Sequence, residues 1–229
     1  GSGSEADALA VRGVLLRQIG AGPGRWRDQR PHVITQATEH PAVLSACEYL
    51  IRLHGAEVTV LGVDDTGMVD PERLRAAMTD RTMLVSIMHA NNETGTLQRI
   101  AELAAITHEY VDARFHTDAA QSVGKVSVNV DELGVDLLTV VGHKMYAPKG
   151  VGALWVRDGV RLEPIVGGGG QEGGDRAGTE NVAGIVALGA AAELASSALA
   201  SETARLTALR DRLQAALEDA LPGRVTLNG

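Results

Sequence analysis

The stretch Leu138-Thr139-Val140-Val141-Gly142-His143-Lys144-Met145-Tyr146-Ala147-Pro148-Lys149-Gly150 decides how the rest of the chain can be interpreted. Its apolar, β-branched first residues predict a buried strand that ends at Gly142. His143 and Lys144 follow side by side, before Pro148 prevents a regular element from continuing. The pattern therefore predicts a lysine at the end of a buried strand.

A lysine at a strand end is chemically useful when its amine can lose a proton, because only the neutral amine attacks an aldehyde to form a Schiff base. Pyridoxal phosphate carries such an aldehyde. Lysines are also common in exposed turns, so Lys144 alone does not distinguish a cofactor lysine from a surface lysine.

The composition is that of a globular protein without unusual bias. The 229 residues are 45% hydrophobic and 22% charged, enough for one large domain or two small ones with a real core. The net charge of -8 and the 3% aromatic content argue against a nucleic-acid binder. The single cysteine, Cys47, falls on an apolar helix face and is expected to be a buried, inert thiol.

The sequence contains no apolar run that we expect to cross a bilayer, which takes about 20 residues. The first residues lack the pattern of a secretory signal, and Gly1-Ser2-Gly3-Ser4 could also be a linker. We therefore expect a cytoplasmic location.

Strands and helices alternate along the first two thirds of the chain. Strands are predicted at 32–36, 57–63, 82–88, 114–118 and 151–157, and helices at 5–19, 41–54, 71–78 and 100–111, with a loop at 20–31. The strand at 82–88 is apolar throughout, as in a sheet covered on both faces. This order predicts an α/β fold, a three-layer sandwich with a mainly parallel sheet.

Polar side chains follow several of these strands. Because parallel strands end at one edge of the sheet, these side chains are expected to meet there. The residues are Asn92, Asp118, Gln121, His143 and Lys144.

Two further segments have the composition of an anion-binding site. Gly3 and Ser4 open a helix, and Arg176 and Thr179 lie in the glycine-rich segment 167–181, which could otherwise be a flexible linker.

The C-terminal part is predicted to contain two helices, at 181–199 and 206–217, and the start of a strand at 224–227. We interpret residues 1–198 as one domain and residues 199–229 as the beginning of a second, smaller one. We therefore expect the chain to be part of a longer protein.

Six motifs in order resemble the cysteine desulfurase and selenocysteine lyase family, whose members are class V, fold-type I pyridoxal phosphate enzymes. The motifs are Gly3-Ser4-Glu5-Ala6, Thr38-Glu39-His40, His89-Ala90-Asn91-Asn92-Glu93-Thr94-Gly95, His116-Thr117-Asp118-Ala119-Ala120-Gln121, Gly142-His143-Lys144 and Arg176-Ala177-Gly178-Thr179-Glu180-Asn181.

The resemblance implies a role for each of these residues. Lys144 would form the Schiff base with the cofactor and transfer protons, and His40 would stack on the cofactor ring. Asp118 would pair with the ring nitrogen, Gln121 would hydrogen-bond the phenolic oxygen, and Asn92 would lie near that oxygen and the substrate carboxylate. The remaining implied cofactor contacts are Gly3, Ser4, Val141, Gly142, His143 and, from the other subunit of a homodimer, Thr179.

Two departures from the family pattern matter. Val141 stands where many cysteine desulfurases carry a serine, which together with the long connection between Ser4 and His32 is more like selenocysteine lyase. The persulfide-forming cysteine and the carboxylate-binding arginine of the family belong to a C-terminal domain that these 229 residues do not include.

The implied activity is removal of sulfur or selenium from L-cysteine or L-selenocysteine, giving L-alanine, with a possible sulfur-acceptor protein as partner. Two alternatives stay open: another class V enzyme, such as an aminotransferase or an epimerase, or an inactive module that only dimerises or acts as a scaffold. A metal site is disfavoured because the seven histidines lack the close spacing of zinc ligands.

Overall fold

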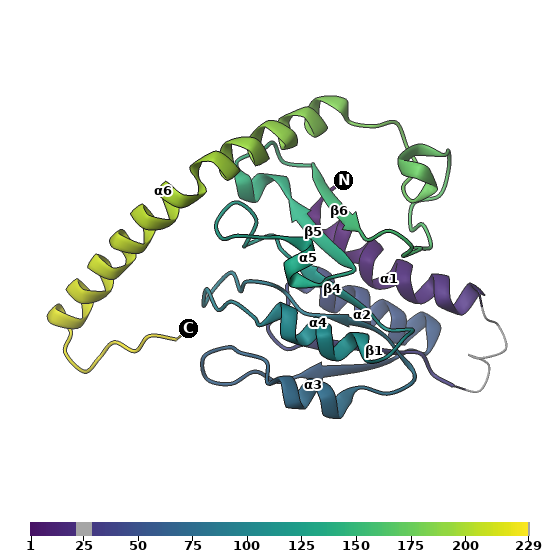
Figure 1. Cartoon of the computed structure of the whole chain (residues 1–229), viewed down its shortest axis with the longest axis horizontal. Coiled ribbons are helices and arrows are strands. Elements are labelled where there is room, and N and C mark those ends of the chain that lie inside the picture. The colour runs from purple at the N-terminus through teal and green to yellow at the C-terminus, as the bar shows by residue number, and fades with distance from the viewer. Residues whose placement is uncertain (22–28, 229) are drawn as a thin grey trace.

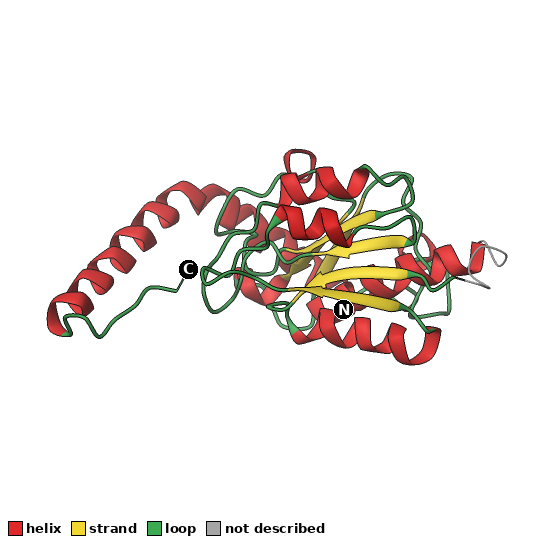
Figure 2. Cartoon of the chain, turned by 90° about the horizontal axis from the view of Figure 1, so that it is seen from below, coloured by secondary structure: helices red, strands yellow, loops and turns green. Residues whose placement is uncertain are grey.

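The computed structural model describes residues 1–21 and 29–228. Six strands form one sheet in the order β2-β1-β3-β4-β5-β6, and helices lie on both of its faces (Figures 1 and 2). The first five strands are parallel, and β6 pairs antiparallel to β5. The predicted three-layer α/β fold with a mainly parallel sheet is confirmed.

The strands are β1 His32–Gln36, β2 Glu57–Leu61, β3 Thr82–Ser86, β4 Arg114–Asp118, β5 Leu137–Val141 and β6 Gly152–Val156. The α-helices are α1 Gly3–Ala21, α2 Pro41–His54, α3 Pro71–Ala77, α4 Ile100–His108, α5 Val130–Leu133 and α6 Val182–Ala220, with 3-10 helices η1 Gly142–Met145 and η2 Gln171–Gly174. Gly20 and Ala21, expected in a loop, belong to α1, and the loop residues 22–28 lie outside the described residues.

Local signals account for the ends of α2. Pro41 occupies its first turn, where no backbone N–H is needed, and the His40 side chain caps the helix. Gly55 follows with φ 63°, a left-handed conformation that glycine adopts without steric cost. The same kind of signal predicts α3, which begins at Pro71 after the Asp70 cap.

Two apolar cores lie on opposite faces of the sheet. On one face α3 and α4 pack on the sheet around Leu74, Leu103 and Phe115. On the other, α1 and α2 pack around Leu15 and Leu50. Burial on both faces explains why the central strands have no alternating pattern of polar residues.

The prediction of two C-terminal helices is wrong. A single 39-residue helix, α6, covers both segments, because residues 200–205 contain neither glycine nor proline to end it. It extends beyond the sheet (Figure 1). Residues 224–227, expected to form a strand, have no strand assignment, and no neighbouring strand is available in the described chain to pair with them.

The expectation that no apolar run reaches membrane-spanning length also needs correction. Part of α6 is long and apolar enough to cross a bilayer by length and composition alone. One such helix is weak evidence, because helices of soluble proteins pass the same test. The apolar character of this part comes largely from alanines between Val182 and Leu199, with Glu193 among them.

Candidate functional site

The carboxyl ends of β1, β3, β4 and β5 meet at one edge of the sheet, because these strands are parallel neighbours. Residues 38–40 follow β1, residues 89–92 follow β3, Asp118 ends β4, and residues 142–144 follow β5. Except for Thr179 and the helix-opening Gly3 and Ser4, the residues predicted from the sequence therefore belong to this edge.

The first turn of α1 lies at the same edge. A Cβ added to Gly3 would come within 2.4 Å of Val141 Cγ2, so the helix start touches the last residue of β5. One turn later, Asp7 Oδ1 lies 3.9 Å from His116 Nε2, which in turn lies 3.0 Å from Thr139 Oγ1 on β5. The helix therefore runs antiparallel to β5 and presents the free N–H groups of its first turn beside Gly142 and His143.

Lys144 lies in a tight turn directly after β5. Gly142 donates its N–H to Val151 O at 3.1 Å, and a Cβ at Gly142 would lie 2.8 Å from that oxygen. Tyr146 closes the turn with φ 65°, a left-handed conformation that is uncommon outside glycine. His143 and Lys144 are both exposed on this turn, which holds the lysine amine at the strand edge.

Asp118 is a buried carboxyl group, 4% exposed, at the centre of the edge. Its Oδ1 accepts a hydrogen bond from Ala120 N at 2.8 Å. Burial raises the Asp118 pKa, while the hydrogen bond to Ala120 and the positive charges of His40 and Lys144 lower it. Among the described residues the group has no buried cation as a partner, which makes it suited to a positively charged ligand atom.

His40 is held at the junction of β1 and α2. Its Nδ1 accepts the Ala42 N–H at 3.1 Å, which leaves Nε2 to carry the proton of the neutral ring. The ring is exposed, and its charge acts on Asp118. An imidazole fixed by the backbone in this way can present one face to a flat ligand.

Asn91 connects the loop after β1 with its own loop after β3 through hydrogen bonds. Its Nδ2 donates to Thr38 O at 3.1 Å, and its Oδ1 accepts from Glu93 N and Thr94 N. The next residue, Asn92, stays exposed at the same edge. Gln121 follows Asp118 by one turn, and its Oε1 accepts from Lys125 Nζ at 2.9 Å.

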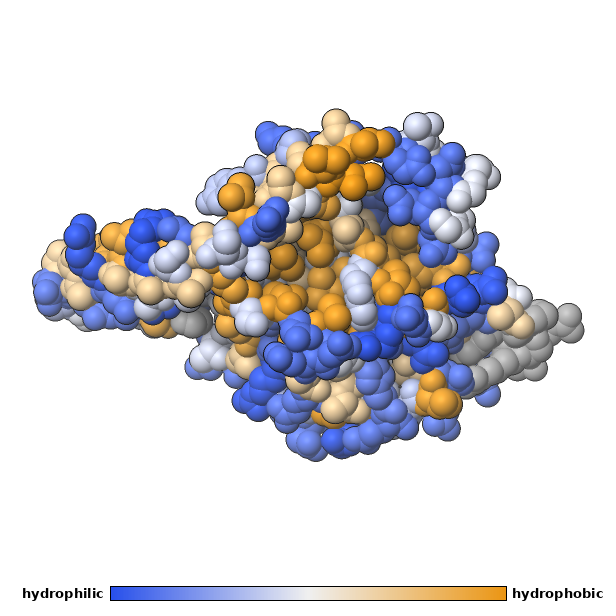
Figure 3. All heavy atoms as spheres, turned by 45° about the horizontal axis from the view of Figure 1, so that its top comes forward, coloured by the Kyte–Doolittle hydropathy of each residue, from blue (hydrophilic) through white to orange (hydrophobic). Residues whose placement is uncertain are grey.

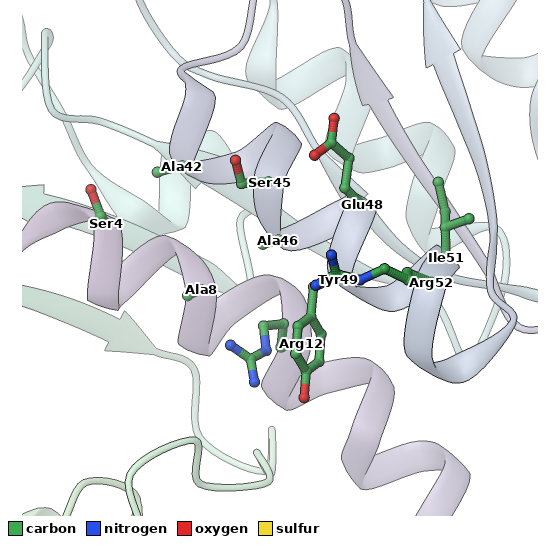
Figure 4. A pocket seen from close by; sticks show the side chains of 10 residues that line it. All are labelled: Ser4, Ala8, Arg12, Ala42, Ser45, Ala46, Glu48, Tyr49, Ile51 and Arg52. Carbon is green, nitrogen blue, oxygen red and sulfur yellow. The ribbon is translucent and has the colours of Figure 1, made fainter.

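Ser4 and Thr179 line different cavities. Ser4 lies with Arg12, Ser45 and Tyr49 around a cavity of about 610 Å³ between α1 and α2, where the Arg12 guanidinium stacks 3.6 Å above the Tyr49 ring (Figure 4). Thr179 lines a cavity of about 550 Å³ beneath α6, next to the ion pair of Arg176 Nε with Glu5 Oε1 at 2.7 Å.

The second cavity opens onto a hollowed apolar face. Figure 3 shows this face between α6 and the glycine-rich segment 167–181. The apolar residues that line it include Leu9, Ala153, Leu154, Val156, Ile185 and Leu188, from α1, β6 and α6. Within one chain, therefore, Thr179 faces an apolar hollow.

Sequence reasoning missed two buried acids near the edge. Glu39 accepts the Met88 N–H at 2.5 Å, its other oxygen has no hydrogen-bond partner among the described residues, and burial raises its pKa well above the usual value. Asp7 is 2% exposed, and its pKa is raised to about 8, first by burial and then by the charge of Asp118. The sequence contained one signal for Asp7: it follows Gly3 by four residues, so the two residues lie on the same face of α1.

Cys47 is buried on α2, as predicted, and burial raises the pKa of its thiol to about 12. The thiol is therefore uncharged near neutral pH and is a poor nucleophile.

The chain matches known proteins along most of its length. The profile of the aminotransferase class-V family matches residues 16–228. A cysteine desulfurase IscS of Dictyoglomus turgidum is 51% identical over 209 residues, which are 91% of this chain and 50% of the relative. The chain thus spans about half the length of the curated relatives it matches.

Solved structures agree with this similarity. DndA from Streptomyces lividans has a TM-score of 0.84 at 38% identity, covering 94% of this chain and 60% of that one. A structure described as SspA in complex with cysteine has a TM-score of 0.76 at 39% identity, covering 84% of this chain and 53% of that one.

Proposed function

This chain belongs to the aminotransferase class-V family, and we propose that it is the cofactor-binding part of a pyridoxal phosphate-dependent cysteine desulfurase. The full-length protein would remove sulfur from L-cysteine and release L-alanine. The observation that carries the proposal is the buried Asp118, which has no buried cation beside it in the described chain and lies at the same strand edge as the exposed Lys144.

The residues present fit the phosphate end of the cofactor. The first turn of α1 supplies free N–H groups and the Ser4 hydroxyl, and Gly3 lets the helix start lie against Val141. His143, next to that turn, adds a third donor. A phosphate at this helix end is favoured by the helix dipole as well as by hydrogen bonds.

The residues at the other strand ends are suited to binding the pyridine ring of the cofactor. Asp118 would keep the ring nitrogen protonated, His40 would cover one face, and Lys144 would reach the aldehyde carbon. Gln121 and Asn92 would hydrogen-bond the phenolic oxygen, and the absence of a side chain at Gly142 allows the turn that carries Lys144 to pack closely against Val151. When bound, pyridoxal phosphate supplies an electron sink for the substrate carbon next to the ring.

The residues of this chain would then move protons and position the substrate. Lys144 would take and return the proton on the substrate α-carbon, since its amine is exposed at the strand edge where the cofactor and substrate would bind. Asn92 would orient the substrate carboxylate. Capture of the sulfur would fall to a cysteine elsewhere in the full-length protein, since the Cys47 thiol is buried and uncharged.

Cysteine is the favoured substrate because the relatives bear the name cysteine desulfurase and one similar structure is described with cysteine. Val141 and the long connection between Ser4 and His32 are the features that favour selenocysteine. We further propose a cytoplasmic homodimer in which Thr179 reaches the cofactor of the other subunit, a sulfur-acceptor protein as partner, and a domain division near residue 198.

The cofactor proposal is tested by adding pyridoxal phosphate to the purified protein and recording its absorbance spectrum. The wild type should gain a protein-bound absorbance band, and Lys144→Ala should lose it. Lys149→Ala is the matched control, because Lys149 is a second exposed lysine in the same connection between β5 and β6. A folded wild-type protein without a bound band would disprove the proposal.

The reaction is tested by incubating the full-length, cofactor-loaded protein with L-cysteine. Formation of L-alanine with sulfide or protein-bound persulfide supports a desulfurase. A keto acid product would instead indicate an aminotransferase, and racemised substrate an epimerase. A scaffold protein would yield no product, and its wild type and Lys144→Ala variant would dimerise equally.

A further inference from the structure

Beyond β3, the backbone N–H of Met88 points to the side of the sheet where β1 has already ended. Its neighbours Ile87 and His89 donate their N–H groups to carbonyl oxygens of β4 at 3.1 and 2.9 Å, and the second of these carbonyls is that of Asp118. Successive N–H groups of a strand alternate in direction, so Met88 turns toward β1. Because β1 ends at Gln36, no strand carbonyl follows there to accept this N–H.

The side chain of Glu39 occupies this position. Its Oε1 accepts the Met88 N–H at 2.5 Å, in place of the carbonyl that a longer β1 would supply. Glu39 is 6% exposed, and its Oε2 has no hydrogen-bond partner among the described residues. Burial raises the Glu39 pKa well above its usual value, so the group holds its proton and accepts the hydrogen bond as a neutral carboxyl.

This hydrogen bond joins two parts of the candidate site. Glu39 is followed directly by His40, and Met88 is followed directly by His89, which holds the carbonyl of Asp118. His40 and Asp118 are therefore connected through two hydrogen bonds that start from consecutive N–H groups. Since such bonds have a narrow range of lengths and angles, they fix the place of His40 relative to Asp118.

The loop that carries His40 has a second attachment. Asn91 Nδ2 donates to Thr38 O at 3.1 Å, so the backbone before Glu39 is held independently of the Glu39 side chain. Loss of the Glu39 contact is therefore expected to loosen His40 while the loop stays folded.

We propose that Glu39 is a positioning residue that holds the His40 ring at a fixed distance from Asp118, so that one residue covers the face of the cofactor ring while the other binds its nitrogen. The inference rests on the proposed cofactor site and deepens it, because it assigns a task to a buried acid that no cofactor contact requires. An apolar side chain at position 39 would avoid the cost of burying a carboxyl group but would leave the Met88 N–H without its acceptor.

Removing the acceptor should weaken cofactor binding through His40. In Glu39→Leu, a side chain of similar volume cannot accept the Met88 N–H. We expect the dissociation constant of pyridoxal phosphate to rise about tenfold, which is the size of effect that loss of one ring-stacking contact produces. The visible circular dichroism of the bound cofactor should shift toward that of His40→Ala, because both variants lack a fixed ring over the cofactor.

Combining the two changes separates positioning from a general loss of stability. If Glu39 acts through His40, adding Glu39→Leu to His40→Ala should change the dissociation constant by less than about twofold. Glu39→Gln keeps a neutral side chain whose carbonyl oxygen can accept the Met88 N–H. It should therefore bind pyridoxal phosphate within about twofold of the wild type.

His32→Leu is the matched control for the loss of a buried polar contact. His32 lies at the opposite end of β1 from His40 and is 2% exposed, and its ring nitrogens lie 2.9 Å from Thr82 Oγ1 and 2.8 Å from Thr59 Oγ1. The change should lower the melting temperature, as Glu39→Leu does, without altering the affinity for the cofactor or its circular dichroism.

The measurements are equilibrium titrations of each purified protein with pyridoxal phosphate, the visible circular dichroism of the bound form, and thermal unfolding. Equal effects of Glu39→Leu with and without His40 would overturn the inference, as would a Glu39→Gln protein that binds as weakly as Glu39→Leu. A folded wild type that binds no pyridoxal phosphate would disprove the cofactor site itself, a result distinct from the first two. If Glu39→Leu does not fold, Glu39→Met, whose thioether is only a weak acceptor, provides the same comparison.

Discussion

At the scale of single residues, the candidate site concentrates acids in a place where water does not reach. Asp7, Glu39 and Asp118 are all buried, the charge of Asp118 raises the pKa of both other acids, and the charge of Asp7 also raises the pKa of Glu39. The positive charges that act on Asp118 are those of exposed side chains, His40 and Lys144. A bound ring nitrogen would therefore meet an anion that the described part of the protein leaves without a buried partner.

The raised pKa of Asp7 makes the cofactor-free protein less stable as pH rises. The native group holds its proton up to about pH 8, whereas the usual value, near that of the unfolded chain, is 3.8. The native state thus binds more protons between about pH 4 and pH 8, and the free energy of unfolding falls across that range by up to about 1.4 kcal/mol per pH unit. The raised pKa of Asp118 acts in the same direction.

We therefore expect Asp7→Asn to flatten this decline. Urea unfolding of the cofactor-free protein at pH 5, 6, 7 and 8 measures the free energy of unfolding. Asp7→Asn should become more stable relative to the wild type as the pH increases. Asp65→Asn, a change at an exposed aspartate, serves as the control. Parallel pH curves for wild type and Asp7→Asn would contradict the expectation.

These residues also mark the limit of what the sequence could predict about the site. Asp118, His40 and Lys144 follow strands, so their arrival at one edge follows from the topology of a parallel sheet. Asp7 and Glu39 look like ordinary helix and loop acids in the sequence. Their burial depends on β4 and β5 or on Met88, elements far away in the chain, and no local pattern encodes such contacts.

At the scale of elements, the contact of α1 with β5 depends on Gly3, which has no side chain. A Cβ at position 3 would lie 2.4 Å from Val141 Cγ2 but 3.5 Å from Val141 Cβ. The conflict therefore comes from one γ-methyl group of Val141, Cγ2, and not from the backbone. The helix start can approach the strand end only while position 3 is glycine or position 141 is small.

Gly3→Ala is accordingly expected to destabilise the protein by about 1–3 kcal/mol, the usual cost of forcing an extra group into a packed contact. Val141→Ala should lose some packing by itself but should accommodate the alanine at position 3. The double variant should therefore be more stable than the sum of the two single changes predicts. Denaturant unfolding of all four proteins tests this, and simple additivity would show that the two residues do not compete for space.

The elements differ in how far the sequence determines them. β1 and β4 were predicted with the bounds that the structure has. The two helices predicted after residue 181 form one, since a weakly apolar, alanine-rich sequence without breakers continues a helix whether or not a core supports it. Helix propensity, not packing, decides the length of α6.

At the scale of the whole molecule, α6 is the element whose apolar surface lacks a partner within the described chain. The helix is 39 residues long, about 58 Å, and Gly184 is its one buried residue. In its second half, leucines recur at intervals of three and four residues and are 41–62% exposed; they are Leu206, Leu209, Leu213 and Leu217. A stripe of this kind covers a core in most proteins.

Under the domain division that we propose near residue 198, we expect the leucine stripe to pack against a part of the full-length protein outside these residues, since the chain spans about half the length of its relatives. If the remainder of the full-length protein packs on the stripe, the double change Leu209→Glu and Leu213→Glu should lower its melting temperature by about 5 °C or more, as buried charges without partners do. Arg212→Glu is the matched control, because one Arg-to-Glu change alters the net charge by -2, as the two Leu-to-Glu changes do. Since charge alone cannot then explain a difference, equal melting temperatures for both variants would mean that the stripe faces water in the full-length protein too.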